Sequence, residues 1–104
     1  QLEELNTFLC EKADDMKAQD IATINVIGKS SITDFMIVCT GTSKRHVTSI
    51  AEHLTNESKS LGITPVGVNG DNQGEWVIVD MGSTIVHVMQ EEQRGLYNLE
   101  KLWG

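Results

Sequence analysis

The stretch that decides the fold is GEWVIVDMGSTIVHVM, residues 74–89. It consists of two runs rich in β-branched residues on either side of Gly82-Ser83. This pair suits a two-residue hairpin turn, because the first position takes a positive φ that glycine adopts without steric cost. The stretch is therefore predicted to form two antiparallel strands. The register set by this turn pairs Trp76 with Met89, Val77 with Val88, Ile78 with His87, Val79 with Val86, Asp80 with Ile85 and Met81 with Thr84.

The predicted hairpin has two unlike faces, because side chains alternate along a strand. The first face is apolar and comprises Val77, Val79, Val86 and Val88, with Met81 at its end. The second face mixes aromatic, aliphatic and polar groups and comprises Trp76, Ile78, Asp80, Ile85, His87 and Met89. We expect the first face to join the core. The second is either a recognition surface or is covered by a further helix, with Asp80 and His87 at its rim.

Helical and strand periods alternate along the rest of the chain. Apolar residues three and four positions apart predict helices over 2–17, 44–61 and 90–103. Runs rich in β-branched residues predict further strands over 20–27, 33–40 and 63–69. The short connection between the first two strands favours an antiparallel pair, and Pro65 indicates an edge position or a strand start for the third. We expect a single α/β (α+β) domain over residues 1–104, with a mixed sheet of about five strands flanked by helices in the order α-β-β-α-β-β-β-α.

The predicted helix over 44–61 has recognisable ends. Thr42 or Ser43 is a suitable N-cap, and Gly62 suits the position after the last turn. The apolar stripe of this helix is expected to comprise Val47, Ile50, Ala51, Leu54, Ser58 and Leu61. The Gly-Thr-Ser turn over 41–43 has a second interpretation, an anion site formed by backbone N–H groups, although most such turns only cap a helix.

Composition and charge narrow the classes of function. The 104 residues carry 15 acidic and 8 basic side chains, a net charge of −7. This balance is unfavourable for direct nucleic-acid binding, which depends on Lys and Arg at phosphates, and it favours a basic protein partner. The alternative is that acidity only maintains solubility. No apolar run is long enough to cross a bilayer and no secretory segment precedes the first helix, so we expect a cytoplasmic protein with no membrane partner.

Cysteines and histidines form no metal or redox motif in the sequence. Cys10 and Cys39 lie far apart without a Cys-x-x-Cys pattern, so both thiols are expected to be free, buried and reduced. His46 and His53 lie seven residues apart, which separates them by two helical turns and is not a zinc pattern. Neither a metal nor a cofactor is expected.

Several carboxylates lie near turns or strand ends, namely Asp34, Asp71, Glu75 and Asp80. Two such groups could hold Mg²⁺ with a phosphate substrate, as in nucleotidyltransferases, which need an Asp-x-Asp pair on the strand after a Gly-Ser turn. Here a helix without such a pair follows the turn, and no local motif indicates a Ser-His or Cys-His nucleophile. A nucleotide-binding or nucleotidyltransferase-like enzyme is therefore the alternative hypothesis, and a non-catalytic binding protein is the leading one.

Most of the aromatic residues lie towards the C-terminus. Trp and Tyr anchor interfaces when a partner buries them. We predict that Trp76, on the mixed face of the hairpin, contacts a partner, and that Trp103 packs the last helix against the sheet. Arg45 opposes the helix macrodipole, so it is either a solvated charge or a contact residue.

Three separated segments carry a resemblance to a known family. They are SSITDFMIVCTGTSKRH (30–46), GEWVIVDMGSTIVHVM (74–89) and YNLEKLW (97–103). In this order and spacing they resemble the ribosomal silencing factor family, also called Iojap-like proteins, over most of the chain from Asp20 to Trp103. The chain resembles a bacterial member.

The resemblance implies a function that composition alone does not indicate. Family members bind the large ribosomal subunit through its fourteenth protein and block joining of the small subunit, which represses translation when nutrients are scarce. The family is also implicated in large-subunit assembly, and some members form homodimers. The implied fold is a nucleotidyltransferase-like core without the catalytic motif, so the implied mechanism is steric and needs no chemistry.

The matched segments also imply which residues bind the partner. The hairpin supplies Trp76, Asp80, Met81 and His87, and the other candidates are Tyr97, Glu100, Arg45, His46 and Asp71. Asp34 is expected instead to brace the SSITD turn. Met81 stands where the family often has an aromatic residue, and Asn98 stands where an Asp is common, so contacts at these positions are expected to differ.

Overall fold

The computed structural model describes residues 2–31, 33–70 and 75–97. Its elements are α1 (Leu2–Asp15), β1 (Gln19–Asn25), β2 (Phe35–Gly41), α2 (Lys44–Ser60), β3 (Gly67–Gly70), β4 (Trp76–Asp80), β5 (Thr84–Gln90) and α3 (Glu91–Tyr97). The predicted order of helices and strands is confirmed. The part of the last predicted helix beyond residue 97 lies outside the described residues.

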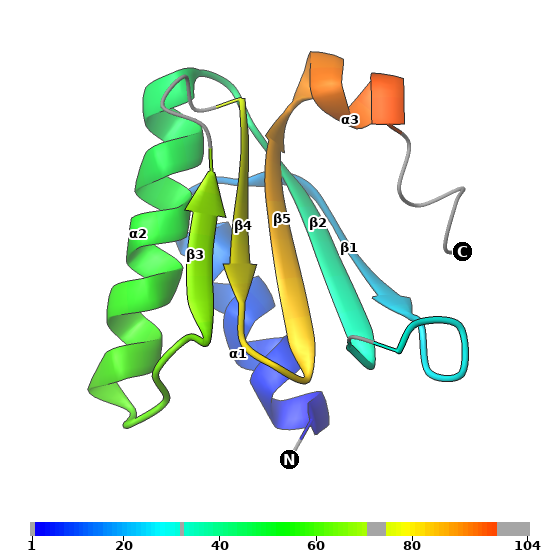
Figure 1. The fold of residues 1–104 in the computed structure, drawn as a ribbon. Helices are drawn as coiled ribbons and strands as arrows, with labels where there is room; N and C mark the ends of the chain where they lie inside the picture. The colour runs from blue at the N-terminus through cyan, green and yellow to red at the C-terminus, as the bar shows by residue number, and fades with distance from the viewer. Residues whose placement is uncertain (1, 32, 71–74, 98–104) are drawn as a thin grey trace.

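The five strands form one mixed sheet in the order β1-β2-β5-β4-β3 (Figure 1). β2 and β5 are parallel, and the other neighbouring pairs are antiparallel. The hairpin has the predicted register, from Trp76 opposite Met89 to Asp80 opposite Ile85. Gly82 takes a φ of +88°, and the backbone N–H of Met81 donates to the carbonyl of Thr84 at 2.9 Å. β3 lies at an edge, as Pro65 indicated, but it begins at Gly67 and not at Ile63, so Pro65 precedes the strand.

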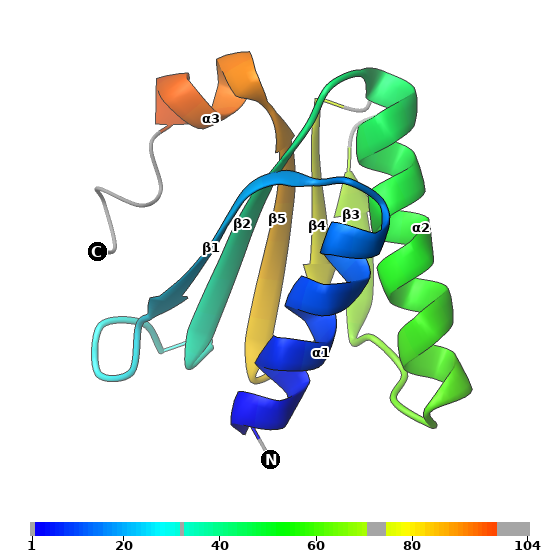
Figure 2. The ribbon, with the colours of Figure 1, turned by 180° about the vertical axis from the view of Figure 1, so that it is seen from behind.

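Both long helices pack on the same side of the sheet (Figure 2). The main core forms between them and the apolar hairpin face, and its members are buried. They include Leu9 and Ala13 of α1, Val47, Ile50 and Leu54 of α2, and Val77, Val79, Val86 and Val88 of the hairpin. This confirms the apolar face as core. Burying these side chains stabilises the fold by about 1.5–3 kcal/mol for each large aliphatic group.

Local chemistry fixes both ends of α2. Ser43 is the N-cap, and its hydroxyl accepts from the backbone N–H of His46 at 3.1 Å. At the other end Gly62 has a φ of +82°, and its N–H donates to the carbonyl of Lys59. The predicted stripe is buried through Ser58. The prediction that Leu61 belongs to this stripe is wrong. Leu61 is 59% exposed, because it is the C-cap and lies beyond the last helical turn.

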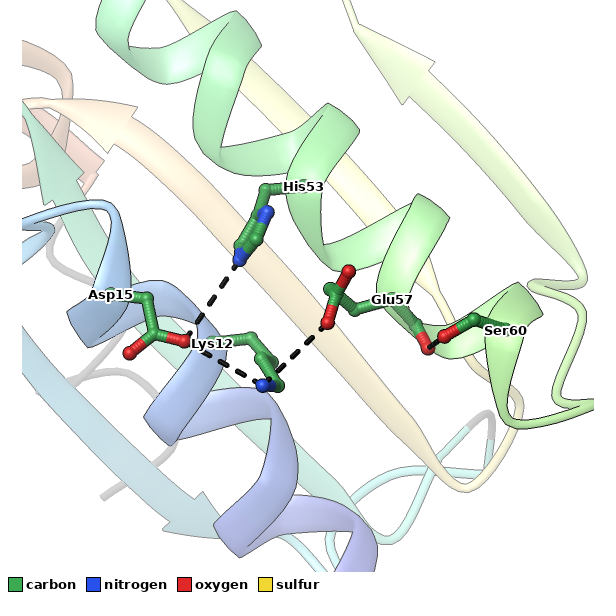
Figure 3. A network of polar contacts seen from close by, with 5 residues as sticks. All are labelled: Lys12, Asp15, His53, Glu57 and Ser60. Atoms are coloured by element: carbon green, nitrogen blue, oxygen red, sulfur yellow. Dashed lines mark hydrogen bonds and ion pairs between the residues drawn. The ribbon is translucent and has the colours of Figure 1, made fainter.

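Polar side chains join α1 and α2 at their exposed margin (Figure 3). Lys12 Nζ lies 3.6 Å from carboxylate oxygens of both Asp15 and Glu57, and His53 Nε2 lies 4.0 Å from Asp15 Oδ2. All four side chains are partly exposed, so each pair contributes at most about 1 kcal/mol. The apolar contact beneath them therefore holds the two helices together.

Candidate docking surface

The side of the sheet opposite α1 and α2 carries the mixed hairpin face. Of the described helices, only α3 packs on this side, and it contacts β5 and β2 at the end of the sheet where α2 begins (Figure 1). Arg94 of α3 donates to Thr40 Oγ1 at 2.9 Å, and Gln93 donates to Glu75 Oε2 at 3.1 Å. Among the described residues α3 contacts only this end of the face, so the alternative of a covering helix with Asp80 and His87 at its rim stays a prediction.

A second apolar cluster lies on this side. Its buried members are Ile24, Val26, Met36, Val38 and Met89, and Trp76 packs against them while remaining partly exposed. Trp76, Ile78, Asp80 and Ile85 are all half-buried, and together they form what we call the hairpin strip. The neighbouring edge strand presents only Gly67 and Asn69 to this side, because Val68 shares the side of Val79. The strip thus combines apolar area and one carboxylate without a bulky neighbour on β3.

Trp76 and His87 form a polar pair within this face. The indole Nε1–H of Trp76 donates to His87 Nδ1 at 3.0 Å, and the two ring centroids lie 5.8 Å apart at an angle of 49°. His87 is only 6% exposed, and burial lowers its pKa to about 4. The imidazole is therefore neutral at pH 7 and contributes no positive charge to the surface.

Asp80 lies at the far end of the strip from Trp76. The two residues are four positions apart along β4, which corresponds to about 13 Å between their Cα atoms. Asp80 Oδ1 accepts from the backbone N–H of Gly82 at 2.8 Å, so the carboxylate also holds the hairpin turn. Its side chain stays half-buried, so it can serve both the turn and a basic partner.

Met81 does not lie on the hairpin strip. It belongs to the main core on the side of the sheet that the helices cover, and it is only 8% exposed. The alternation that places Val79 in the core places Met81 there also. The structure therefore separates Met81 from Trp76 and Asp80.

Arg45 and His46 lie in the first turn of α2, at the same end of the sheet as Trp76. Arg45 is exposed. His46 instead joins the start of α2 to the turn that follows α1: its Nδ1 accepts from the backbone N–H of Thr42 at 2.8 Å, and its Nε2 donates to the carbonyl of Met16 at 2.7 Å. No sequence pattern indicates this contact, because Met16 is thirty residues away and the bond uses its backbone carbonyl.

The remaining candidates are only partly described. Tyr97 is the last described residue of α3, and its side chain lies outside the description, as do Asp71 and Glu100. Asp34 contributes through its backbone, since its N–H donates to the carbonyl of Ser83 and its carbonyl accepts from the N–H of Val26. These bonds tie the β1–β2 connection to the turn of the hairpin.

A polar cavity of about 480 Å³ lies where β2 and β5 end. Its lining comprises Gln19, Thr40–Thr42 and Gln90–Glu92. Small ligands often bind at the carboxyl ends of parallel strands. Here two carboxylates line the cavity, and the N–H of Thr42 already donates to His46, so the site is poorly suited to a phosphate group.

Neither thiol takes part in this face. Cys10 and Cys39 are both free, as predicted; Cys39 is buried, whereas Cys10 is only half-buried. Burial raises the pKa of Cys39 to about 12, so its thiol stays protonated. Over the described ranges, no three acidic, histidine or cysteine side chains gather as metal ligands. None of the helices in the described ranges is long and apolar enough to span a membrane.

Known proteins resemble this chain in both sequence and structure. A ribosomal silencing factor from Haemophilus influenzae is 50% identical over 97 residues, which cover 93% of this chain and 95% of that protein. A crystal structure of a Chromobacterium violaceum protein matches with a TM-score of 0.96 at 36% identity, over 100% of this chain and 87% of that one.

A relative with lower sequence identity has a name that refers to the large ribosomal subunit. The mouse protein "Mitochondrial assembly of ribosomal large subunit protein 1" is 36% identical over 89 residues, which cover 83% of this chain and 39% of that protein. A sequence model of the family described as "Ribosomal silencing factor during starvation" matches residues 1–104. The chain therefore belongs to the ribosomal silencing factor family, in agreement with the resemblance that its three segments carry.

Proposed function

We propose that this chain binds the large ribosomal subunit through the subunit's fourteenth protein and sterically blocks joining of the small subunit, which represses translation when nutrients are scarce. The family description, with its words "silencing" and "starvation", supports the regulatory role. The name of the mouse relative supports the large subunit as the partner. Such a function requires a surface and no catalytic group, and it operates in the cytoplasm.

The observation that carries the choice of surface is that both long helices lie on one side of the sheet, whereas α3 is the one described helix on the other side and contacts it at one end. α1 and α2 bury one side, whereas the hairpin strip on the other side keeps an aromatic ring, two isoleucines and a carboxylate at the surface. Half-exposed aromatic and aliphatic groups beside a carboxylate suit a basic protein, because the ring supplies contact area and the charge supplies attraction. We assign Trp76 and Asp80 to direct contact.

The other predicted residues take different places in this proposal. Arg45 is exposed at the same end of the sheet as Trp76 and borders the contact. Tyr97, Glu100 and Asp71 stay predictions. Met81 supports the strip from the core, and His46 supports the start of α2 through Met16. Homodimer formation also stays a prediction, which sedimentation equilibrium tests.

The test of this proposal is binding to the purified fourteenth protein and to large subunits. Trp76→Ala should retain the fold and lose most of the binding, since a buried aromatic anchor is worth about 2 kcal/mol or more. Ile27→Ala is the control, because it removes an apolar side chain that is 56% exposed and lies outside the hairpin strip, just after β1. Equal binding by both variants would exclude the hairpin strip.

The alternative enzyme hypothesis has its own measurement. Nucleoside triphosphates with Mg²⁺ are titrated while backbone amide shifts are followed by NMR. Saturable shifts at residues 41–43 and 90–92, which line the polar cavity, would favour a nucleotide site there. We expect no saturable shift, because the carboxylates of Glu91 and Glu92 repel phosphate groups.

A further inference from the structure

The Trp76–His87 pair joins two neighbouring strands diagonally. Trp76 is opposite Met89, and His87 is opposite Ile78, so the two rings lie on the same side of the sheet at diagonal positions. The indole has one N–H and no acceptor, and it normally needs an acceptor when it is partly buried. His87 Nδ1 provides this acceptor at 3.0 Å. The bond requires the neutral tautomer with its proton on Nε2.

The second imidazole nitrogen of His87, Nε2, has no such hydrogen bond to any described residue. Within the described part of the chain, Nε2 is buried and has no hydrogen-bond partner. Its neighbours on this side are apolar: Val38 lies opposite His87 on β2, and Met89 lies two residues along β5. A buried N–H without an acceptor destabilises a fold, and an aliphatic side chain would avoid this cost. Stability alone therefore does not account for an imidazole at this position.

We propose that His87 is the positioning residue for Trp76. It holds the indole in one orientation across β4 and β5, so that the ring meets the partner in a fixed pose, and it does not touch the partner itself. Its 6% exposure supports this division of roles, because little of the imidazole is accessible. The consequence for binding rests on the proposed function, whereas the pairing of the two rings does not.

Two substitutions separate the acceptor from the bulk of the imidazole. His87→Asn keeps an oxygen acceptor close to the place of Nδ1, whereas His87→Leu fills the space without an acceptor. We expect His87→Leu to weaken large-subunit binding about tenfold, the loss that corresponds to one ordinary hydrogen bond. His87→Asn should restore binding to within about twofold, which a purely space-filling role would not predict.

Nuclear magnetic resonance tests the pairing without a partner. The chain has two tryptophans, so Trp76→Phe identifies the Trp76 indole signal by its loss. In the unsubstituted protein the imidazole nitrogen shifts should report a proton on Nε2 and none on Nδ1. The indole N–H should exchange faster with solvent in His87→Leu than in His87→Asn.

The outcomes distinguish this proposal from the proposed function. A proton on Nδ1, or an indole signal that His87→Leu leaves unchanged, overturns the positioning role whatever the binding results are. A changed indole signal with unaltered binding in His87→Leu, while Trp76→Ala loses binding, also overturns it, because the orientation of the ring would then not matter. Unaltered binding in Trp76→Ala overturns docking by the hairpin strip and leaves the pairing intact.

Discussion

At the scale of single residues, His87 makes stability depend on pH. Burial lowers its pKa from 6.5 to about 4. Between these values the unfolded chain binds a proton that the folded chain does not bind, so the free energy of unfolding falls as the pH falls from about 6.5 to about 4. The loss is on the order of 3 kcal/mol. Denaturant unfolding at a series of pH values measures it.

Carboxylates also titrate near pH 4, so the comparison needs a reference without the imidazole. His87→Asn provides it, because asparagine does not titrate. The difference between the two stability curves should change through this pH window and be constant above pH 7. Parallel curves would mean that His87 takes up its proton at the same pH in the folded and unfolded chains.

Asp80 combines a structural bond with a proposed contact. Asp80→Ala removes the acceptor for the N–H of Gly82, and we expect the free energy of unfolding to drop by about 1 kcal/mol. Asp80→Asn keeps an acceptor and should cost less. Both variants should bind the basic partner more weakly, because both lose the charge. If Asp80→Asn binds as the unsubstituted chain does, the carboxylate serves only the turn.

Some properties of these residues could be predicted from the sequence, and others could not. The mixed face was predictable, because alternation along a strand is local and follows from the position of the turn. The burial of His87 was not, since it depends on a strand and a cluster remote in sequence, including Val38. The bond from His46 to the carbonyl of Met16 has no side-chain signal at all.

At the scale of elements, the pairing within the hairpin could be predicted from the sequence, whereas the pairing of the hairpin with the rest of the sheet could not. The register of β4 and β5 follows from Gly82 and the residues beside it, so it could be predicted in full. The parallel pairing of β2 with β5 joins segments about fifty residues apart, and no local pattern specifies it. Alternation along the hairpin indicated which face joins the core, but whether another element covers the mixed face depends on contacts remote in sequence, so the sequence left both interpretations of that face open.

At the junction of β2 and α2, Val47 approaches the backbone of Gly41 so closely that only glycine fits at this position. A Cβ placed on Gly41 would lie 2.6 Å from Val47 Cγ2 and 2.9 Å from the Val47 backbone nitrogen. Gly41→Ala should therefore displace the start of α2 and cost about 1–3 kcal/mol, the usual range for overpacking. Thermal or denaturant unfolding measures the loss.

Gly67→Ala is the matched control for this substitution. A Cβ on Gly67 meets only Asn69 Nδ2 at 3.7 Å, an ordinary contact on an edge strand. We expect little change in stability, because the added methyl group displaces nothing. Equal losses for the two variants would indicate that glycine flexibility, and not the Val47 contact, explains the result at Gly41.

At the scale of the whole molecule, charge and shape serve the proposed function differently. The hairpin strip offers a contact area of a few side chains, whereas the net charge of −7 acts on the entire approach of a basic partner. The association rate with the fourteenth protein should therefore fall on the order of tenfold as salt rises from ~0.01 to ~1 M, over which the Debye length shrinks from about 30 to about 3 Å. Stopped-flow mixing measures it.

A charge remote from the strip separates this long-range attraction from contact. Glu11 is exposed on α1, on the other side of the sheet from Trp76. Glu11→Lys reduces the net negative charge by two units, so it should slow association at low salt and leave the dissociation rate unchanged, because no contact is lost. Trp76→Ala should do the reverse and mainly speed dissociation. An association rate that responds neither to salt nor to Glu11→Lys would mean that the acidity of this chain maintains its solubility and does not guide it to the ribosome.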